Sequence, residues 1–132
     1  MLHPYKLESA FFISLKFERI SEVPMKLQLK YSVDIKSVDE ENQKRLQIFL
    51  RFRTHDDQPV NINIELVGIF KLADENLVPD KKALNEFIFD QAIYILWPNI
   101  SEIVKQITVL MGLNPIQLPL PYNINFENKD LV

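Results

Sequence analysis

The chain has 132 residues, of which 47% are hydrophobic and 25% are charged, and its formal net charge at pH 7 is -3. This length and composition are typical of a folded globular protein, and we expect a single domain over residues 1–132. Two glycines are too few for a phosphate-cradling loop, and the acidic balance offers no basic field to nucleic acid. Because cysteine is missing, disulfides, thiolate zinc sites and thiol nucleophiles are excluded.

The first four residues lack the basic stretch and apolar run of a signal peptide. No apolar run approaches the roughly 20 residues that span a bilayer. We therefore expect a cytoplasmic protein that does not insert into membranes.

Four segments alternate apolar and polar side chains with a period of two, which predicts antiparallel strands with one buried face. They cover residues 10–20, 25–36, 44–53 and 60–72, joined by short polar links, one of them acidic at 37–43. In the first segment the pattern predicts that Phe12 faces outward and that four neighbours face inward: Phe11, Ile13, Leu15 and Phe17. Gly68 in the fourth segment indicates a bulge or a close backbone approach.

After residue 72 the pattern becomes helical, with Asp80 as the predicted N-cap. Pro98 is expected to break or kink this helix, and Asn99 with Glu102 is typical of a capping box that restarts it. Gly112 marks the C-terminal end. The fold class predicted is therefore α+β: a four-stranded antiparallel sheet, a long helix broken or kinked at Pro98, and a C-terminal segment.

The C-terminal segment, residues 115–126, contains three prolines between apolar residues, so it is expected to lie extended across the body. The helical stretch 87–97 is apolar on nearly every side, which predicts a second cover beyond the sheet. Another subunit is one candidate for that cover, and the proline-rich segment is the other. The candidate interface residues are Phe87, Phe89, Ile93, Leu96 and Trp97.

Several short motifs occur in the order and spacing of a known family. They are Gly68-Ile69-Phe70, Ile95-Leu96-Trp97-Pro98, Gln117-Leu118-Pro119-Leu120 and Asn125-Phe126. The sequence resembles the SecB export-chaperone family over about residues 24–126. That family has phenylalanine at the position of Trp97 and asparagine at that of Pro119.

This resemblance implies a homotetramer, built as a dimer of dimers, in which first strands pair between subunits and long helices lie between the sheets. It also implies an ATP-independent holding chaperone without a cofactor, whose clients are unfolded preproteins or an antitoxin. The client-binding groove would be lined by Met25, Leu27, Leu29, Ile116, Leu118, Leu120 and Tyr122. In the family, acidic residues of the exposed sheet face contact the SecA motor. The candidate motor-contact residues here are Glu18, Glu22, Asn61, Asn63 and Glu65, two of which are asparagines.

The alternatives to a chaperone are an enzyme, a nucleic-acid-binding protein and a structural subunit. An enzyme is disfavoured because the two histidines, His3 and His55, have no metal-pair spacing, and Asp56-Asp57 is typical of a turn. A basic stripe on the third strand is more typical of a solvated sheet face than of nucleic-acid binding; it comprises Lys44, Arg45, Arg51 and Arg53. A structural oligomer subunit, or a binder dedicated to one partner, shares every folding feature with a chaperone.

Overall fold

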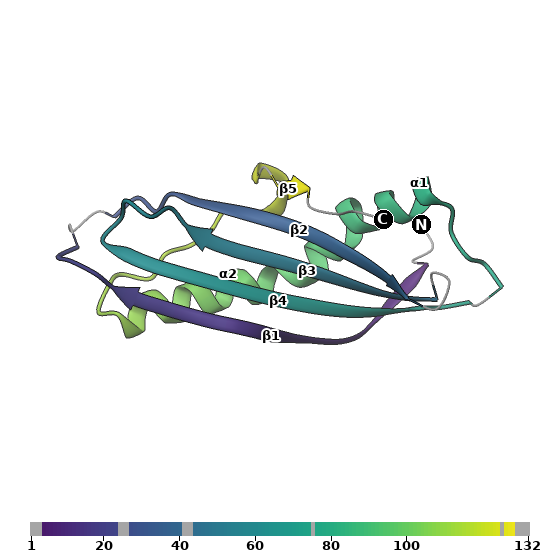
Figure 1. The fold of residues 1–132 in the computed structure, drawn as a ribbon, viewed down its shortest axis with the longest axis horizontal. Helices are drawn as coiled ribbons and strands as arrows, with labels where there is room; N and C mark the ends of the chain where they lie inside the picture. The colour runs from purple at the N-terminus through teal and green to yellow at the C-terminus, as the bar shows by residue number, and fades with distance from the viewer. Residues whose placement is uncertain (1–3, 24–26, 41–43, 75, 125, 129–132) are drawn as a thin grey trace.

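The computed structural model describes residues 4–23, 27–40, 44–74, 76–124 and 126–128 (Figure 1). Four strands come first, and a long helical stretch follows them, which confirms the predicted α+β class. The strands are β1 (Tyr5–Arg19), β2 (Tyr31–Glu40), β3 (Arg45–Thr54) and β4 (Val60–Leu72). The helical stretch comprises α1 (Lys81–Phe87), a π-helical segment (Ile88–Ala92) and α2 (Ile93–Leu110). A 3-10 turn (Pro121–Asn123) and a short strand β5 (Phe126–Asn128) end the described chain.

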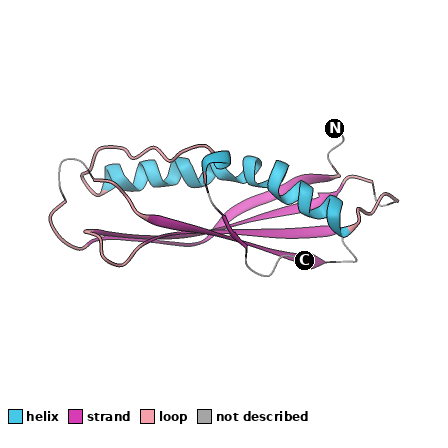
Figure 2. Ribbon diagram, turned by 90° about the horizontal axis from the view of Figure 1, so that it is seen from above, coloured by secondary structure: helices cyan, strands magenta, loops and turns pink. Residues whose placement is uncertain are grey.

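The sheet has the order β1-β4-β3-β2-β5, in which β5 is parallel to β2 and the other pairs are antiparallel. The helix lies along one face of this sheet (Figure 2). Alternate apolar residues of β3 and β4 point toward the helix and are fully buried, as the period of two predicts. They include Leu46, Ile48, Leu50, Phe52, Ile62, Ile64 and Leu66.

The second strand begins later than predicted. It starts at Tyr31, not at residue 25, and it continues through the predicted acidic loop to Glu40. Tyr31 pairs with Thr54, where β3 ends, so the described residues 27–30 have no partner strand. The Lys30 carbonyl still accepts a hydrogen bond from His55 N at 3.0 Å, and the Lys30 backbone also bonds to the Gln58 side chain, whose Oε1 accepts from Lys30 N at 2.7 Å and whose Nε2 donates to Lys30 O at 2.6 Å.

The predicted facing of β1 is wrong at two aromatic residues. Phe12 pairs with Leu66 and lies on the helix side, whereas Phe11 pairs with Val67 and lies on the opposite side. The register shifts between Phe12 and Ser14, and a second shift precedes Ser9. Each bulge adds a residue to one strand and reverses the alternation beyond it, so simple periodicity cannot follow β1 along its length.

The N-terminal end of the helix is confirmed, because Asp80 Oδ1 accepts a hydrogen bond from Ala83 N at 2.8 Å. The break at Pro98 and the restart at Asn99 are wrong, because α2 runs through both residues. Leu96, Trp97 and Ile100 are buried on either side of the proline. Their packing on the sheet offsets the hydrogen bond that a proline removes. The irregularity lies earlier, in the π-helical segment.

The helix ends before Gly112, which adopts a left-handed conformation with φ of 79°. Gly68 was expected to mark a bulge or a close backbone approach. The structure shows the close approach, which is to the helix. A Cβ placed at Gly68 would lie 2.6 Å from Leu96 Cδ2. The glycine therefore lets α2 rest directly on β4.

Candidate functional site

The proline-rich segment covers the helix on the side away from the sheet's β1 edge. Trp97 Nε1 donates a hydrogen bond to Pro119 O at 3.0 Å, and the Trp97 and Phe126 rings meet edge to face at 5.8 Å. Phe126 in turn pairs with Val33 as β5 joins the edge of β2. Ile116 N also donates a hydrogen bond to Thr108 Oγ1 at 3.1 Å, so the segment is fixed both on the helix and on the sheet.

The candidate interface residues pack into the core of the single chain. Phe87, Ile93, Leu96 and Trp97 are all buried within one chain, at 3% exposure or less, and Phe89 is half-buried against the same core. They need no second subunit to shield them from water. The apolar side chains that the helix does leave exposed in this region are those of Tyr94 and Ile95.

The predicted groove residues differ in how far their side chains are exposed to solvent. Leu29 and Leu118 both pack against the core, Leu27 and Ile116 are half-buried, and Met25 lies outside the described residues. Two others are solvent-exposed: Leu120 at 58% and Tyr122 at 68%. The proline-rich segment therefore buries some apolar side chains and presents the next ones to solvent.

A longer apolar strip lies along β1, at the free edge of the sheet. Five large apolar side chains of this strand are between 40% and 51% exposed: Leu7, Phe11, Ile13, Leu15 and Phe17. We call these five residues the β1 strip; the register places Leu7, Leu15 and Phe17 on the helix side of the sheet and Phe11 on the opposite side. Sequence reasoning assigned four of them to the core, because alternation marks a face and does not reveal that the strand lies at an edge. In the described sheet β1 pairs with β4 alone, so its other side presents unpaired backbone groups.

The candidate motor-contact residues do gather on one surface, the sheet face opposite the helix. The register places Glu18 beside Asn61 and brings Asn63 and Glu65 onto the same face. Glu22 lies beyond the end of β1 and is exposed. Four of the five residues are therefore neighbours.

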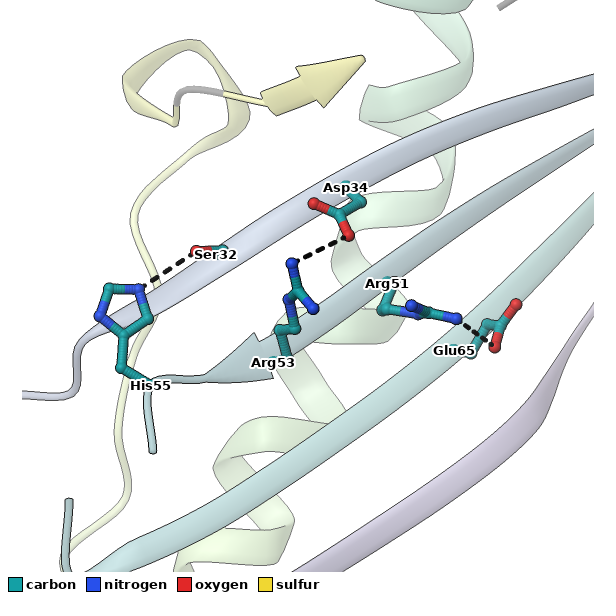
Figure 3. A network of polar contacts seen from close by, with 6 residues as sticks. All are labelled: Ser32, Asp34, Arg51, Arg53, His55 and Glu65. Carbon is teal, nitrogen blue, oxygen red and sulfur yellow. Dashed lines mark hydrogen bonds and ion pairs between the residues drawn. The ribbon is translucent and has the colours of Figure 1, made fainter. Parts of the chain in front are cut away.

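This sheet face is of mixed charge, because cations alternate with the acidic residues (Figure 3). Arg51 Nη2 lies 3.7 Å from Glu65 Oε2, and Arg53 Nη2 lies 3.7 Å from Asp34 Oδ2. Lys16 lies on this face opposite Asn63. A pocket of about 410 Å³ on this face is lined by Lys16, Arg51, Arg53 and Glu65, together with Ser14, Asn63 and Ile64. An acidic docking face for a basic partner is not formed here.

A serine–histidine contact lies at one end of the same face. Ser32 Oγ and His55 Nε2 are 3.1 Å apart, and the hydrogen bond is exposed to solvent (Figure 3). A catalytic pair would require a third group that orients the imidazole and a sheltered site for the reacting atom. No acidic side chain among the described residues hydrogen-bonds His55. The contact between Ser32 and His55 therefore does not indicate a catalytic site.

Two tyrosines have perturbed acidity. Burial, and secondarily the charge of Asp39, raises the pKa of Tyr5 to about 12. Burial also raises the pKa of Tyr31, whose ring stacks on Phe52 at 4.9 Å. Both shifts follow from rings held in the core.

Within the described ranges, no helix is both long enough and apolar enough to cross a membrane. Nor do three histidine, cysteine, aspartate or glutamate side chains converge there in a way that could hold a metal ion.

Together, the sheet order, the long helix and the extended C-terminal cover define a SecB-like fold. The solved structures include a similar one, the Mycobacterium tuberculosis Rv1957 SecB-like chaperone in complex with a ChAD peptide from the Rv1956 HigA1 antitoxin. The TM-score is 0.75 at 12% sequence identity, and the match covers 89% of this chain and 90% of that chain. At this identity the likeness concerns the fold.

A protein of unknown function from Streptococcus agalactiae also matches, at a TM-score of 0.43 and 8% identity, over 88% of this chain and 97% of that chain. No protein-family model matches the chain, and no curated protein matches it.

Proposed function

We propose that this protein is an ATP-independent holding chaperone that binds unfolded polypeptide on exposed apolar surfaces. The observation that carries the proposal is the exposure of large apolar side chains on a SecB-like fold, two groups of which lie at the β1 edge and on the C-terminal segment. One is the β1 strip, and the other is the pair Leu120 and Tyr122. Contiguous exposed apolar surface on a folded protein is typical of interaction sites.

The two surfaces suit different partners. The β1 strip combines apolar side chains with unpaired backbone groups along a 15-residue strand, which suits pairing with the same strand of a second copy. Such an isologous contact would bury the strip and join two sheets into one. We assign this edge to the dimer and, through further contacts of the dimers, to a homotetramer.

Leu120 follows the residue that Trp97 anchors and lies on extended backbone, and Tyr122 lies in the 3-10 turn that comes directly after it. An anchored apolar strip accepts an extended chain by burying its apolar side chains, without reading a particular sequence. We assign this strip, with the half-buried Ile116 and Leu118 beside it, to client binding. The clients would be preproteins or an antitoxin, since the similar Rv1957 structure holds an antitoxin peptide.

Delivery to the SecA motor is not part of the proposal. The sheet face that would serve it carries Arg51 and Arg53 among its acidic residues. Two of the candidate contact positions, Asn61 and Asn63, are uncharged.

The experiment is titration of a permanently unfolded polypeptide, such as a reduced and carboxymethylated small protein, followed by fluorescence anisotropy in the absence of nucleotide. The proposal predicts saturable binding of the unfolded form and none of the native form. Binding of neither form by the folded protein would contradict it and would favour a structural oligomer subunit.

A further inference from the structure

The sheet face away from the helix, which we call the outer face, carries a group of apolar side chains. All described helical segments lie on the other face (Figure 2). A sheet covered on one side normally points apolar residues toward its cover and polar residues toward solvent. Near the middle of this sheet the outer positions depart from that rule. They hold Phe11, Val38, Phe49, Val67 and Ile69, which we call the outer island.

The outer island is continuous from strand to strand. The register places Val67 between Phe11 and Phe49, and Ile69 is the next outer residue of β4. Val67 is buried at 3% exposure, whereas Phe11 is 51% exposed. Pairing of two β1 edges would extend the outer face sideways and leave it open. Contiguous apolar surface rimmed by polar side chains is typical of protein interaction sites.

One end of the outer island adjoins a row of cations. Lys71 is the next outer residue of β4 after Ile69, and the register places it between Lys6 and Arg45. Like charges directly opposite one another on neighbouring strands destabilise a sheet. Neither lysine forms an ion pair in the part of the chain that the structure describes.

Two carboxylates near this row do not saturate it. Glu8 Oε2 lies 3.4 Å from Arg45 Nη2, and Glu40, opposite Arg45, accepts a hydrogen bond from Gln47 Nε2 at 2.7 Å. Arg45 Nε is buried without a hydrogen-bond partner among the described residues. The row therefore keeps charged donors for a further carboxylate.

Cations also lie at the other end of the outer island. Arg51 follows Phe49 on the outer face of β3, and with Lys16 and Arg53 it lines the pocket of about 410 Å³. The carboxylate nearest each arginine is 3.7 Å away, which is longer than a hydrogen bond. Positive donors thus bound the apolar side chains on two sides, in a chain whose net charge is -3.

The spacing of the two cationic ends suits an extended peptide. Arg45 and Arg51 are six residues apart on β3, which corresponds to about 20 Å along a strand. In an extended peptide, two residues six positions apart project from the same side, and so do the two residues at even positions between them. A seven-residue segment can therefore present acidic ends and an apolar centre to this face.

We propose that the outer face binds an extended segment of a partner protein in which an apolar centre lies between two acidic ends. The apolar side chains pack on Phe11 and Phe49. The acidic side chains reach Lys71 and Arg45 at one end and Arg51 at the other. This docking site goes beyond the holding of unfolded clients, because it recognises a pattern of charge on one partner.

Single-stranded nucleic acid is a poorer occupant of the outer face. The aliphatic side chains of Val38, Val67 and Ile69 offer no ring on which a base could stack. The carboxylates of Glu40 and Glu65 would also repel a continuous phosphate backbone, whereas a peptide carries its charges at separate positions.

The test places a fluorophore on the outer face. Because the chain has no cysteine, Ser9→Cys allows one environment-sensitive label opposite Ile69, and Gln106→Cys allows one on α2 as a control. The probe is the capped peptide Asp-Ser-Leu-Ser-Leu-Ser-Asp. Its titration should change the emission at position 9 and leave the emission at position 106 unchanged.

Two further peptides measure the contribution of charge. Replacing both aspartates of the probe by asparagine should weaken binding about fivefold, as expected for two exposed charge pairs, and replacing them by lysine should weaken it further. The preference for aspartate should shrink at high salt, where exposed charges are screened.

The charge variant is Lys6→Gln with Lys71→Gln, which should reduce the preference for aspartate to about twofold. Its matched control is Lys81→Gln with Lys82→Gln, which removes the same charge from exposed positions of α1 and should keep the fivefold preference. Equal loss of preference in both variants would overturn the inference, because the preference would then reflect net charge.

The apolar variant is Phe11→Ser, which should weaken all three peptides several-fold. Phe17→Ser, the matched control, removes a ring of similar exposure from the helix side of the same strand and should leave binding unchanged. Circular dichroism checks that each variant is folded. Equal binding by the two variants would overturn the assignment of the outer island.

The remaining outcomes separate this site from other occupants and from the chaperone function. A labelled protein that suppresses aggregation of unfolded protein but shows no emission change at position 9 would overturn this inference alone. A larger change with oligodeoxythymidine than with the acidic peptide would overturn it in favour of nucleic acid. A loss of oligomer mass in Ile69→Ser would overturn it in favour of a second copy of the chain.

Discussion

Trp97 Nε1 donates a hydrogen bond to the carbonyl oxygen of Pro119 at 3.0 Å, across 22 residues of chain. This bond fixes a segment whose prolines cannot enter a regular sheet. The ring of Trp97 therefore packs in the core, and its indole nitrogen binds the extended segment. The apolar surface at Leu120 depends on this anchor, because Leu120 follows Pro119 directly.

Trp97→Phe should loosen the extended segment while keeping the aromatic contact with Phe126. The lost hydrogen bond should lower the free energy of unfolding by about 1 kcal/mol, with a further loss from the smaller ring. Amide exchange in residues 116–120 should accelerate more than exchange in β3. Equal protection of that segment in the variant and the wild type would show that the bond does not hold it.

Gly68→Ala should destabilise the protein by about 1–3 kcal/mol, because the new Cβ would meet Leu96, which is fully buried and has no room to move. Gly112→Ala is the comparison. Its new Cβ would contact only Arg19 Nη1, at 3.5 Å. The expected destabilisation of about 1–2 kcal/mol therefore comes from the left-handed backbone at this position. Chemical denaturation measures both. A fully stable Gly68→Ala variant would contradict the close approach of α2 to β4.

Leu120→Ser with Tyr122→Ser should weaken binding of an unfolded polypeptide several-fold without changing the midpoint of thermal unfolding, since both side chains are exposed. The matched control is Val109→Ser with Leu110→Ser, which removes two equally exposed apolar side chains from the end of α2. Equal binding by the two variants would contradict the assignment of the client surface.

Under the proposed pairing of β1 edges, the wild type should be oligomeric, and Ile13→Lys with Leu15→Lys should yield monomers that remain folded. Charged side chains along an edge strand oppose pairing of that edge with another. Light scattering coupled to size exclusion gives the mass, and circular dichroism gives the fold. A variant of unchanged mass would place the subunit interface elsewhere.

Alkaline pH should destabilise the protein through Tyr5. Its folded-state pKa of about 12 lies above the ordinary tyrosine value of 10.0, so the folded state holds the proton more tightly. The resulting stabilisation is present below about pH 10 and is lost as the pH rises through 12. Tyr5→Phe should flatten this fall in the free energy of unfolding between pH 10 and 12. An equally steep fall in the variant would assign the effect to other groups.

The parts of the fold that the sequence predicts are those set by local patterns. Alternation locates β3 and β4 closely, and Asp80 and Gly112 mark the helix ends. These signals come from neighbouring residues, so they need no knowledge of the rest of the chain. The resemblance to SecB agrees with them.

The features that the sequence does not reveal are those set by contacts between residues that are distant in the chain. The onset of β2 is set by the end of its partner at Thr54 and by the Gln58 side chain. The facing of β1 depends on two bulges, and its exposure depends on its place at the sheet edge. The burial of Trp97 depends on a segment more than twenty residues away, which helical periodicity cannot locate.

The central claim is that the folded protein holds unfolded polypeptide without nucleotide. Its most direct test is light scattering from a chemically unfolded model protein diluted into buffer with increasing amounts of this protein. The account predicts that aggregation is suppressed at near-stoichiometric ratios. Undiminished aggregation in the presence of the well-folded protein would contradict the claim and leave only the SecB-like fold.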